Sequence, residues 1–190
     1  PDCLSSWGHD FRPSYLRIKN LIQELPTNPT ILALTATATP QVKSDICNQL
    51  GIIEETTIIT GFERENLSFK VIRGQNRLDY ICNYIKQNKN ESGIIYAATR
   101  KEVDNVTNKL KNLGISVGKY HAGLSDAERS KQQDAFLQDN INVMVATNAF
   151  GMGIDKSNVR YVIHYQMPKN MESYYQEAGR AGRDGLESEC

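Results

Sequence analysis

Two arginines near the end of the chain, Arg180 and Arg183, have the type and spacing expected of a phosphate-binding pair. They stand in the run Gln176-Glu-Ala-Gly-Arg-Ala-Gly-Arg-Asp-Gly185, three residues apart and each preceded by glycine. Arginine suits phosphate because its planar guanidinium combines a permanent charge with a fork of donors. Glycine lets the backbone approach a neighbouring surface closely. The alternative is structural, because arginines at the end of a helix also bind its last carbonyl groups.

The elements that must position these arginines alternate between strand and helix from residue 67 onward. The pattern predicts strands at 68–73, 93–97, 117–121, 143–146 and 161–164, and helices at 75–87, 101–113, 125–138 and 170–178. Such alternation is typical of right-handed βαβ units, which build a parallel sheet with helices on both faces. Ligands of open α/β sheets bind at the carboxyl ends of the strands.

Polar residues and glycines follow several of these predicted strands. They offer hydroxyls, backbone amides and cations, but no nucleophile–base pair and no set of metal ligands, which suits a phosphate-rich ligand. Each has a structural alternative: Thr99 is a good helix cap, and His121 fits a structural histidine better than a catalyst. The candidates at this edge are Thr99, Arg100, His121, Thr147, Asn148, Gly151, Gly153 and Asp155.

The first 60 residues predict a smaller part with the same alternation. Helices are expected at 14–25 and 41–50, and strands from residue 30 and at 56–60. The first of these strands runs into Thr35-Ala-Thr-Ala-Thr39, where Thr35 and Thr37 exceed what a helix cap requires. A polar stretch without periodicity then predicts a domain boundary at 60–67.

An aromatic segment opens the chain and has two interpretations. It contains Trp7, His9, Phe11 and Arg12. Most tryptophans are used in cores, so the segment could be a loop that plugs into a core. Aromatic rings beside an arginine are also what single-stranded nucleic acid requires, since bases stack and the cation binds a phosphate. The residues alone favour neither interpretation.

The composition is that of a globular protein with no global preference for polyanions. Of 190 residues, 39% are hydrophobic and 23% charged, and 22 basic residues balance 22 acidic ones. Binding to nucleic acid must therefore come from a local patch rather than from net charge. No apolar run approaches the roughly 20 residues of a membrane span, and no signal peptide opens the chain. The four cysteines are scattered, which predicts reduced thiols inside the cell.

Four segments, in this order and spacing, resemble RecQ-type DNA helicases of superfamily 2. They are Trp7-Gly-His-Asp-Phe-Arg-Pro13, Thr35-Ala-Thr-Ala-Thr39, Val145-Ala-Thr-Asn-Ala-Phe-Gly-Met-Gly-Ile-Asp-Lys156 and Tyr174-Tyr-Gln-Glu-Ala-Gly-Arg-Ala-Gly-Arg-Asp-Gly185. The last two suit the whole superfamily, whereas the first is more specific to RecQ. The resemblance implies an α/β, RecA-like fold with a parallel sheet and helices on both faces. It implies a partial first lobe at 1–59, a linker at 60–67 and a complete second lobe at 68–190.

The resemblance also implies an activity and its residues. ATP with Mg²⁺ would bind between the lobes, and its hydrolysis would drive 3′-to-5′ movement on single-stranded DNA and unwinding of partly duplex DNA in recombination and repair. Arg183 matches the arginine finger, and Arg180 and Gln176 complete the catalytic set. Gly151, Gly153 and Asp155 would line the ATP cleft with both arginines. Residues that match DNA-binding or coupling positions are Trp7, His9, Phe11, Arg12, Thr35, Thr37, Thr99, Arg100, His121, Thr147 and Asn148.

The sequence departs from the family pattern in two places. A P-loop is absent, and so are the Asp-Glu carboxylates that bind magnesium, so no metal ligand is expected here. Asp2 stands where the family has the histidine that follows those carboxylates. We therefore expect a fragment, inactive alone and monomeric, of a protein of the bacterial cytoplasm or the eukaryotic nucleus. The alternatives are a non-catalytic nucleic-acid or protein-binding module and an RNA helicase, against which the aromatic loop argues.

Overall fold

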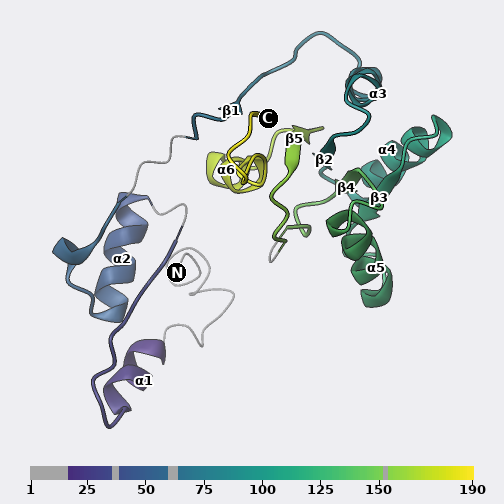
Figure 1. Ribbon diagram of the computed structural model, residues 1–190. Helices are drawn as coiled ribbons and strands as arrows, with labels where there is room; N and C mark the ends of the chain where they lie inside the picture. Colours follow the sequence, from purple (N-terminus) through teal and green to yellow (C-terminus); the bar gives the residue numbers. More distant parts are fainter. Residues whose placement is uncertain (1–16, 36–38, 60–63, 152–153) are drawn as a thin grey trace. The chain divides into compact units, whose positions relative to one another are not determined.

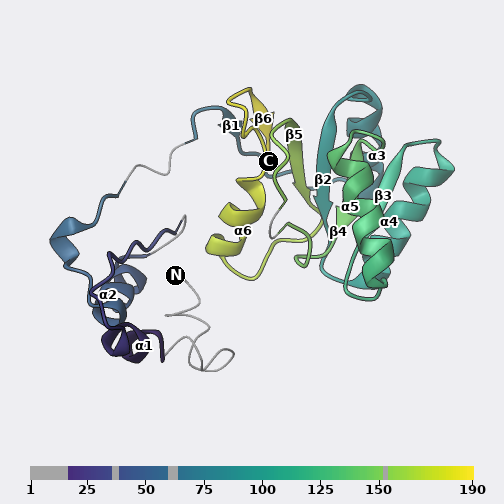
Figure 2. The same ribbon diagram turned by 60° about the horizontal axis from the view of Figure 1, so that its bottom comes forward.

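Figures 1 and 2 show a computed structural model of the chain, which describes residues 17–35, 39–59, 64–151 and 154–190. The chain divides into two compact units, Pro1–Phe62 and Glu63–Cys190, and each is described by itself. The division falls inside the stretch 60–67, where the sequence predicts a boundary. None of the described helices has the length and apolar character needed to cross a membrane.

The second unit is built on a six-stranded sheet in which every recorded strand pair is parallel. The strand order is β1-β6-β5-β2-β4-β3, and the sheet is visible in Figure 2. The strands are β1 (Leu67–Ser68), β2 (Ser92–Tyr96), β3 (Val117–Tyr120), β4 (Val143–Ala146), β5 (Val159–His164) and β6 (Ser188–Glu189). The expected parallel α/β architecture is confirmed.

Helices cover both faces of this sheet because the chain reverses its direction of travel across it. It moves from β2 outward to β3 through α4, and then back to β4 through α5. With crossovers of one handedness, the reversal places the two helices on opposite faces. The helices are α3 (Arg77–Gln87), α4 (Arg100–Asn112), α5 (Asp126–Leu137) and α6 (Met171–Ala178).

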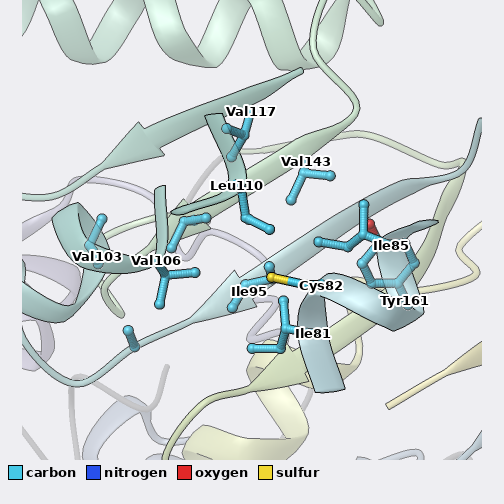
Figure 3. Packing of buried hydrophobic residues seen from close by; sticks show 12 residues of the cluster. Ile81, Cys82, Ile85, Ile95, Val103, Val106, Leu110, Val117, Val143 and Tyr161 are labelled. Atoms are coloured by element: carbon cyan, nitrogen blue, oxygen red, sulfur yellow. The ribbon is translucent and has the colours of Figure 1, made fainter. Parts of the chain in front are cut away.

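Two hydrophobic cores, one on each face, follow from the alternation of side chains along the strands. Ile95 and Val145 lie opposite each other in the register of β2 and β4 and belong to the core under α3 and α4. Their neighbours Ile94 and Met144 belong to the other core, with Phe136 of α5. Figure 3 shows the first core, which contains Ile81, Cys82, Ile85, Ile95, Ala97, Val103, Val106, Leu110, Val117, Val143, Val145 and Tyr161. The strands are therefore fixed from both sides.

The starts of the helices in this unit are set by side-chain caps. Thr99 and Ser125 each form a capping box with the glutamate three residues further on. Asn76 and Asn170 accept hydrogen bonds from the first turns of α3 and α6. Each cap accepts hydrogen bonds from backbone N–H groups of the first helical turn, so it defines the residue at which the helix begins.

The described residues of the first unit form two α-helices and a short 3₁₀ turn, and over these residues both expected strands are wrong. Its elements are α1 (Ile18–Glu24), α2 (Pro40–Leu50) and η3 (Glu54–Thr56). The described residues of 30–35 and 56–59 form no strand. A strand exists only through hydrogen bonds to a neighbour, and no described residue of this unit supplies them. The apolar side chains that would be covered stay exposed, as in Leu32 (78%) and Ile58 (88%).

The edge of the sheet also differs from the prediction. The expected strand 68–73 is reduced to the two residues of β1, and β6 was not predicted at all. The two short strands pair with each other through Leu67↔Ser188 and Ser68↔Glu189. A two-residue strand leaves no periodic signal, so only the pairing across the sheet defines it.

Candidate functional site

Arg180 lies against the backbone of the loop that follows β4. Its Nη1 donates a hydrogen bond to the carbonyl oxygen of Gly151. Gly151 has a φ of 128°, and a Cβ built there would lie 2.1 Å from Cζ of Arg180. Only glycine fits such a backbone and such a contact. The close contact between Arg180 and this loop therefore depends on Gly151, whereas the sequence argument concerned the glycines that precede the arginines.

Arg183 lies against the end of the same loop. Its Nη1 donates to the carbonyl oxygen of Ile154 at 3.0 Å and is 3.7 Å from Oδ1 of Asp155. The Arg183 side chain is 37% exposed and that of Asp155 is 96% exposed. The pair with Asp155 is long and solvated, so it holds Arg183 only weakly. The hydrogen bond to Ile154 occupies one of the five N–H donors of the guanidinium, which leaves capacity for an anionic ligand.

Three polar side chains, those of Tyr96, His164 and Glu177, form a series of contacts that ends at the loop and at α6. Tyr96, at the end of β2, donates its hydroxyl to the carbonyl oxygen of Phe150 at 3.0 Å. Burial raises the pKa of Tyr96 to about 12, so the hydroxyl keeps its proton. The Tyr96 ring stacks on His164, with ring centroids 5.5 Å apart. His164 Nε2 is 2.8 Å from Oε2 of Glu177 on α6. These contacts connect β2, β5 and α6 with the loop that Arg180 contacts.

Thr99 and His121 are held by structural contacts. The Thr99 hydroxyl accepts from the backbone N–H of Glu102, and the Glu102 carboxylate accepts from the backbone N–H of Thr99, which completes the capping box. His121 is 5% exposed, and its Nδ1 accepts from the N–H of Gly123 at 3.1 Å. Its Nε2 is 3.5 Å from Oδ1 of Asp104. Both residues lie at the predicted sheet edge, and their contacts favour the structural alternatives.

Arg100, Thr147 and Asn148 also lie where the sequence places them, after β2 and β4. Arg100 is exposed, and its Cδ is 3.3 Å from a Cβ built at Gly123. The N–H of Thr147 donates to the carbonyl oxygen of Tyr120 at 3.1 Å, and Asn148 is exposed. A cation and an exposed amide are thus available at the edge of the sheet.

The remaining candidates are scattered or lie outside the described residues. Gln176 is exposed on α6, and Thr35 is exposed in the first unit. Trp7, His9, Phe11, Arg12, Thr37 and Gly153 lie outside the described residues. In the part of the chain that the structure describes, no group of three or more His, Cys, Asp and Glu side chains could hold a metal ion. The guanidiniums of Arg180 and Arg183 suit phosphate oxygens rather than a metal ion.

Sequence reasoning missed Tyr96, His164 and Glu177, together with Arg64 and Asn66, which contact the turn between the two arginines. One signal was present in the sequence. Tyr96 and His164 each follow two apolar residues at the end of a strand, and a buried polar group needs a partner. Arg64 and Asn66 stand in a polar stretch without periodicity, which gave no such signal.

This arrangement, a parallel α/β unit with a glycine loop packed on two arginines, is that of a helicase lobe. Residues 76–185 match the family described as "Helicase conserved C-terminal domain", so the chain belongs to that family. A solved structure, described as S. cerevisiae Dbp5 bound to RNA and ADP BeF3, superposes with a TM-score of 0.77. It covers 99% of this chain and 50% of that chain at 22% identity, which supports the fold alone.

The more similar relatives are RecQ-type helicases, which confirms the resemblance seen in the sequence. The chain is 60% identical to the ATP-dependent DNA helicase RecQ of Bacillus subtilis over 188 residues. It is 47% identical over 192 residues to the RecQ-like DNA helicase BLM of Xenopus laevis. Each alignment covers 99% of this chain, but only 32% and 14% of the respective relative. The chain thus spans about a third or less of their length.

Proposed function

We propose that this chain works within an ATP-dependent DNA helicase that moves 3′-to-5′ on single-stranded DNA and unwinds duplexes during recombination and repair. The observation that carries the proposal is the pair Arg180 and Arg183, held on the loop 147–155 at the carboxyl edge of a parallel sheet. The similarity to RecQ helicases along 99% of the chain supports the same activity. Partners are single-stranded and partly duplex DNA.

In this proposal Arg183 is the arginine finger. Its guanidinium stabilises the charge that builds on the γ-phosphate in the transition state, and Arg180 holds neighbouring phosphate oxygens. ATP, held with magnesium, would supply the phosphoryl group that passes to water, and Arg180 and Arg183 would contact its phosphates. Since the sequence lacks a P-loop, the 190 residues alone are expected to hydrolyse no ATP.

DNA contacts are proposed for the residues beside the phosphate site. Arg100 and Asn148 are exposed, so they can contact the DNA backbone. The backbone N–H of Thr147 donates to the carbonyl oxygen of Tyr120, which fixes the start of the loop that leads to Gly151. The aromatic loop with Trp7, His9, Phe11 and Arg12 is the proposed sensor that couples DNA binding to hydrolysis, and we add Thr35 and Thr37 to the coupling set.

The test is Arg183→Ala in the full-length protein. We expect kcat of the DNA-stimulated ATPase to fall about 10³–10⁵-fold, as for the loss of an arginine finger, while nucleotide affinity changes only a few-fold. The control is Arg129→Ala on α5, whose ion pair with Asp126 is exposed and weak. A loss of only a few-fold in the Arg183 variant contradicts the assignment. A wild-type full-length protein that hydrolyses no ATP with DNA present favours the non-catalytic binding module.

A further inference from the structure

Two side chains at the start of the second unit bind the turn between the paired arginines. Arg64 Nη2 donates to the carbonyl oxygen of Ala181 at 3.0 Å and to that of Gly182 at 2.7 Å. Asn66 Nδ2 donates to the same Gly182 oxygen at 2.8 Å and to that of Leu186 at 2.9 Å. Four side-chain hydrogen bonds thus converge on the backbone that carries Arg183 and the loop after it.

The fit around Gly182 is tight. Its φ is 57°, and a Cβ built there would lie 2.5 Å from Nδ2 of Asn66 and 2.8 Å from the carbonyl oxygen of Leu186. Arg64 Nε donates to Oδ1 of Asn66 at 3.3 Å, so the two side chains orient each other. We call Arg64 and Asn66 the carbonyl clasp. It fixes a turn that only glycine can form.

We infer that the carbonyl clasp positions the arginine finger, an inference that rests on the proposed function. The carbonyl of Gly182 belongs to the peptide bond that precedes Arg183, so a hydrogen bond to it restrains the position of Arg183 directly. Arg64 is the second residue of the unit that begins at Glu63. The segment around Arg64 and Asn66 is therefore hydrogen-bonded to the turn, so a movement of this segment would move Arg183.

Arginine is required at position 64 because the two carbonyls are consecutive. One Nη2 group donates to both, while Nε of the same guanidinium donates to Oδ1 of Asn66. A lysine ammonium is a point charge on a flexible stem and cannot hold three acceptors in a fixed geometry. Arg64→Lys thus keeps the charge and loses most of the positioning.

The experiment measures ATP hydrolysis by the full-length protein with saturating single-stranded DNA. Arg64→Ala is compared with Arg73→Ala, an exposed arginine of the same segment that removes the same charge. We expect Arg64→Ala to lower kcat about 100-fold, the loss typical of a catalytic group displaced by about 1 Å. KM for ATP and the melting temperature should stay close to those of Arg73→Ala. Arg64→Lys should give an intermediate kcat, and it also serves if the alanine variant does not fold.

A double mutant separates positioning from a general structural effect. In an Arg183→Ala background, assayed with radiolabelled ATP over hours, removal of Arg64 should lower kcat no further, because the group that it positions is already absent. A further 100-fold loss in that background would mean that Arg64 acts elsewhere, and the inference would be wrong.

The outcomes distinguish this inference from the proposed function. If Arg183→Ala abolishes turnover but Arg64→Ala matches Arg73→Ala, the carbonyl clasp has no positioning role and the arginine finger stands. The same holds if Arg64→Lys matches the wild type. If Arg183→Ala itself leaves turnover nearly intact, the proposed function fails and the inference fails with it.

Discussion

A single residue, Asp139, holds the side chain of Lys156, just after the loop that contacts the two arginines. Oδ1 of Asp139 accepts a hydrogen bond from Nζ of Lys156 at 2.6 Å, and the Lys156 side chain is only 3% exposed. The ammonium also lies 5.1 Å from the centre of the Phe136 ring. Among the described residues, Asp139 is the one non-glycine with a positive φ, 57°. The buried ammonium therefore depends on a carboxylate that the backbone presents from the end of α5.

The variant Asp139→Asn should destabilise the protein in a manner that depends on pH. Asparagine also tolerates positive φ, so the variant mainly removes the charge. The hydrogen bond from Lys156 lowers the pKa of Asp139, so the pair stabilises the fold above the ordinary carboxyl pKa and this contribution is lost as pH falls through the lowered one. We expect a difference of about 1 kcal/mol in unfolding free energy from pH 5 to 8, modest because Asp139 is exposed, that shrinks below about pH 4.

Urea unfolding of both proteins across this pH range measures the difference. A difference that keeps its full size at pH 2.5 would contradict the role of the charge. The Asp126→Asn variant is a suitable control, because Asp126 is 94% exposed and forms an exposed ion pair with Arg129. It should alter unfolding far less than Asp139→Asn does.

At the residue scale, the sequence predicted groups that can bind phosphate and missed groups whose role is to hold others. Arg180, Arg183 and Gly151 stand out because an arginine fork beside glycines suits phosphate, although arginines at a helix end also bind its last carbonyl groups. The partners Arg64 and Asn66 lie more than 110 residues away from the turn that they bind. Contacts over such a separation depend on the folded sheet, and a single sequence carries no local trace of them.

Among the elements, α4 allows the structural and the functional interpretation of Thr99 to be separated. Aspartate is as good an N-cap as threonine, but it adds a negative charge. Thr99→Asp should therefore keep the melting temperature close to that of the parent, whereas Thr99→Ala should destabilise by about 1 kcal/mol. If Thr99 contacts a DNA phosphate, the added charge should also weaken DNA binding by the full-length protein. Unchanged DNA affinity in a folded Thr99→Asp variant shows that the residue is only a cap.

The matched control for that measurement is Ser125→Asp. Ser125 forms the same capping box at the start of α5, so the substitution makes the same structural change at another helix. An equal loss of DNA affinity in both variants would indicate a general effect of charge. A loss confined to Thr99→Asp would assign the contact to Thr99.

Helices and strands were predicted correctly where caps and apolar runs mark them in the sequence, and wrongly where hydrogen bonding to a neighbouring strand decides whether a strand forms. Helices α3 to α6 follow their caps and apolar faces to within a few residues. The central strands are apolar runs buried on both faces, which the sequence shows directly. The strands expected from residue 30 and at 56–60 also contain apolar residues, yet among the described residues they pair with no neighbour. The two-residue strands β1 and β6 pair with each other, but they are too short to show an alternation of apolar and polar residues.

At the scale of the whole molecule, the two units should unfold separately. Among the described hydrophobic residues of the first unit, only Ile46 and Cys47 are buried, whereas the second unit has a core on each face of its sheet. Trp7 is the single tryptophan and belongs to the first unit. We expect tryptophan fluorescence to change at lower urea than the circular dichroism of the second unit, because burial of apolar surface drives folding.

A fragment of residues 63–190 provides the control for this experiment. It should fold alone and reproduce the transition at higher urea in a single cooperative step. Coincident fluorescence and circular dichroism transitions in the 190-residue chain would contradict separate unfolding. An unfolded fragment would mean that the second core needs the first 62 residues.

The parallel pairing of β1 with β6 has a mechanical consequence. Three backbone hydrogen bonds join the strands: Ser188 N–H to Asn66 O at 2.9 Å, Cys190 N–H to Ser68 O at 2.8 Å and Lys70 N–H to Cys190 O at 2.8 Å. A tensile force applied at residues 64 and 190 pulls parallel neighbours along their length, in shear. All three bonds then carry the load together and must break at once, whereas an antiparallel pair pulled in this way would unzip one bond at a time. This edge of the sheet therefore resists extension along the direction of the strands.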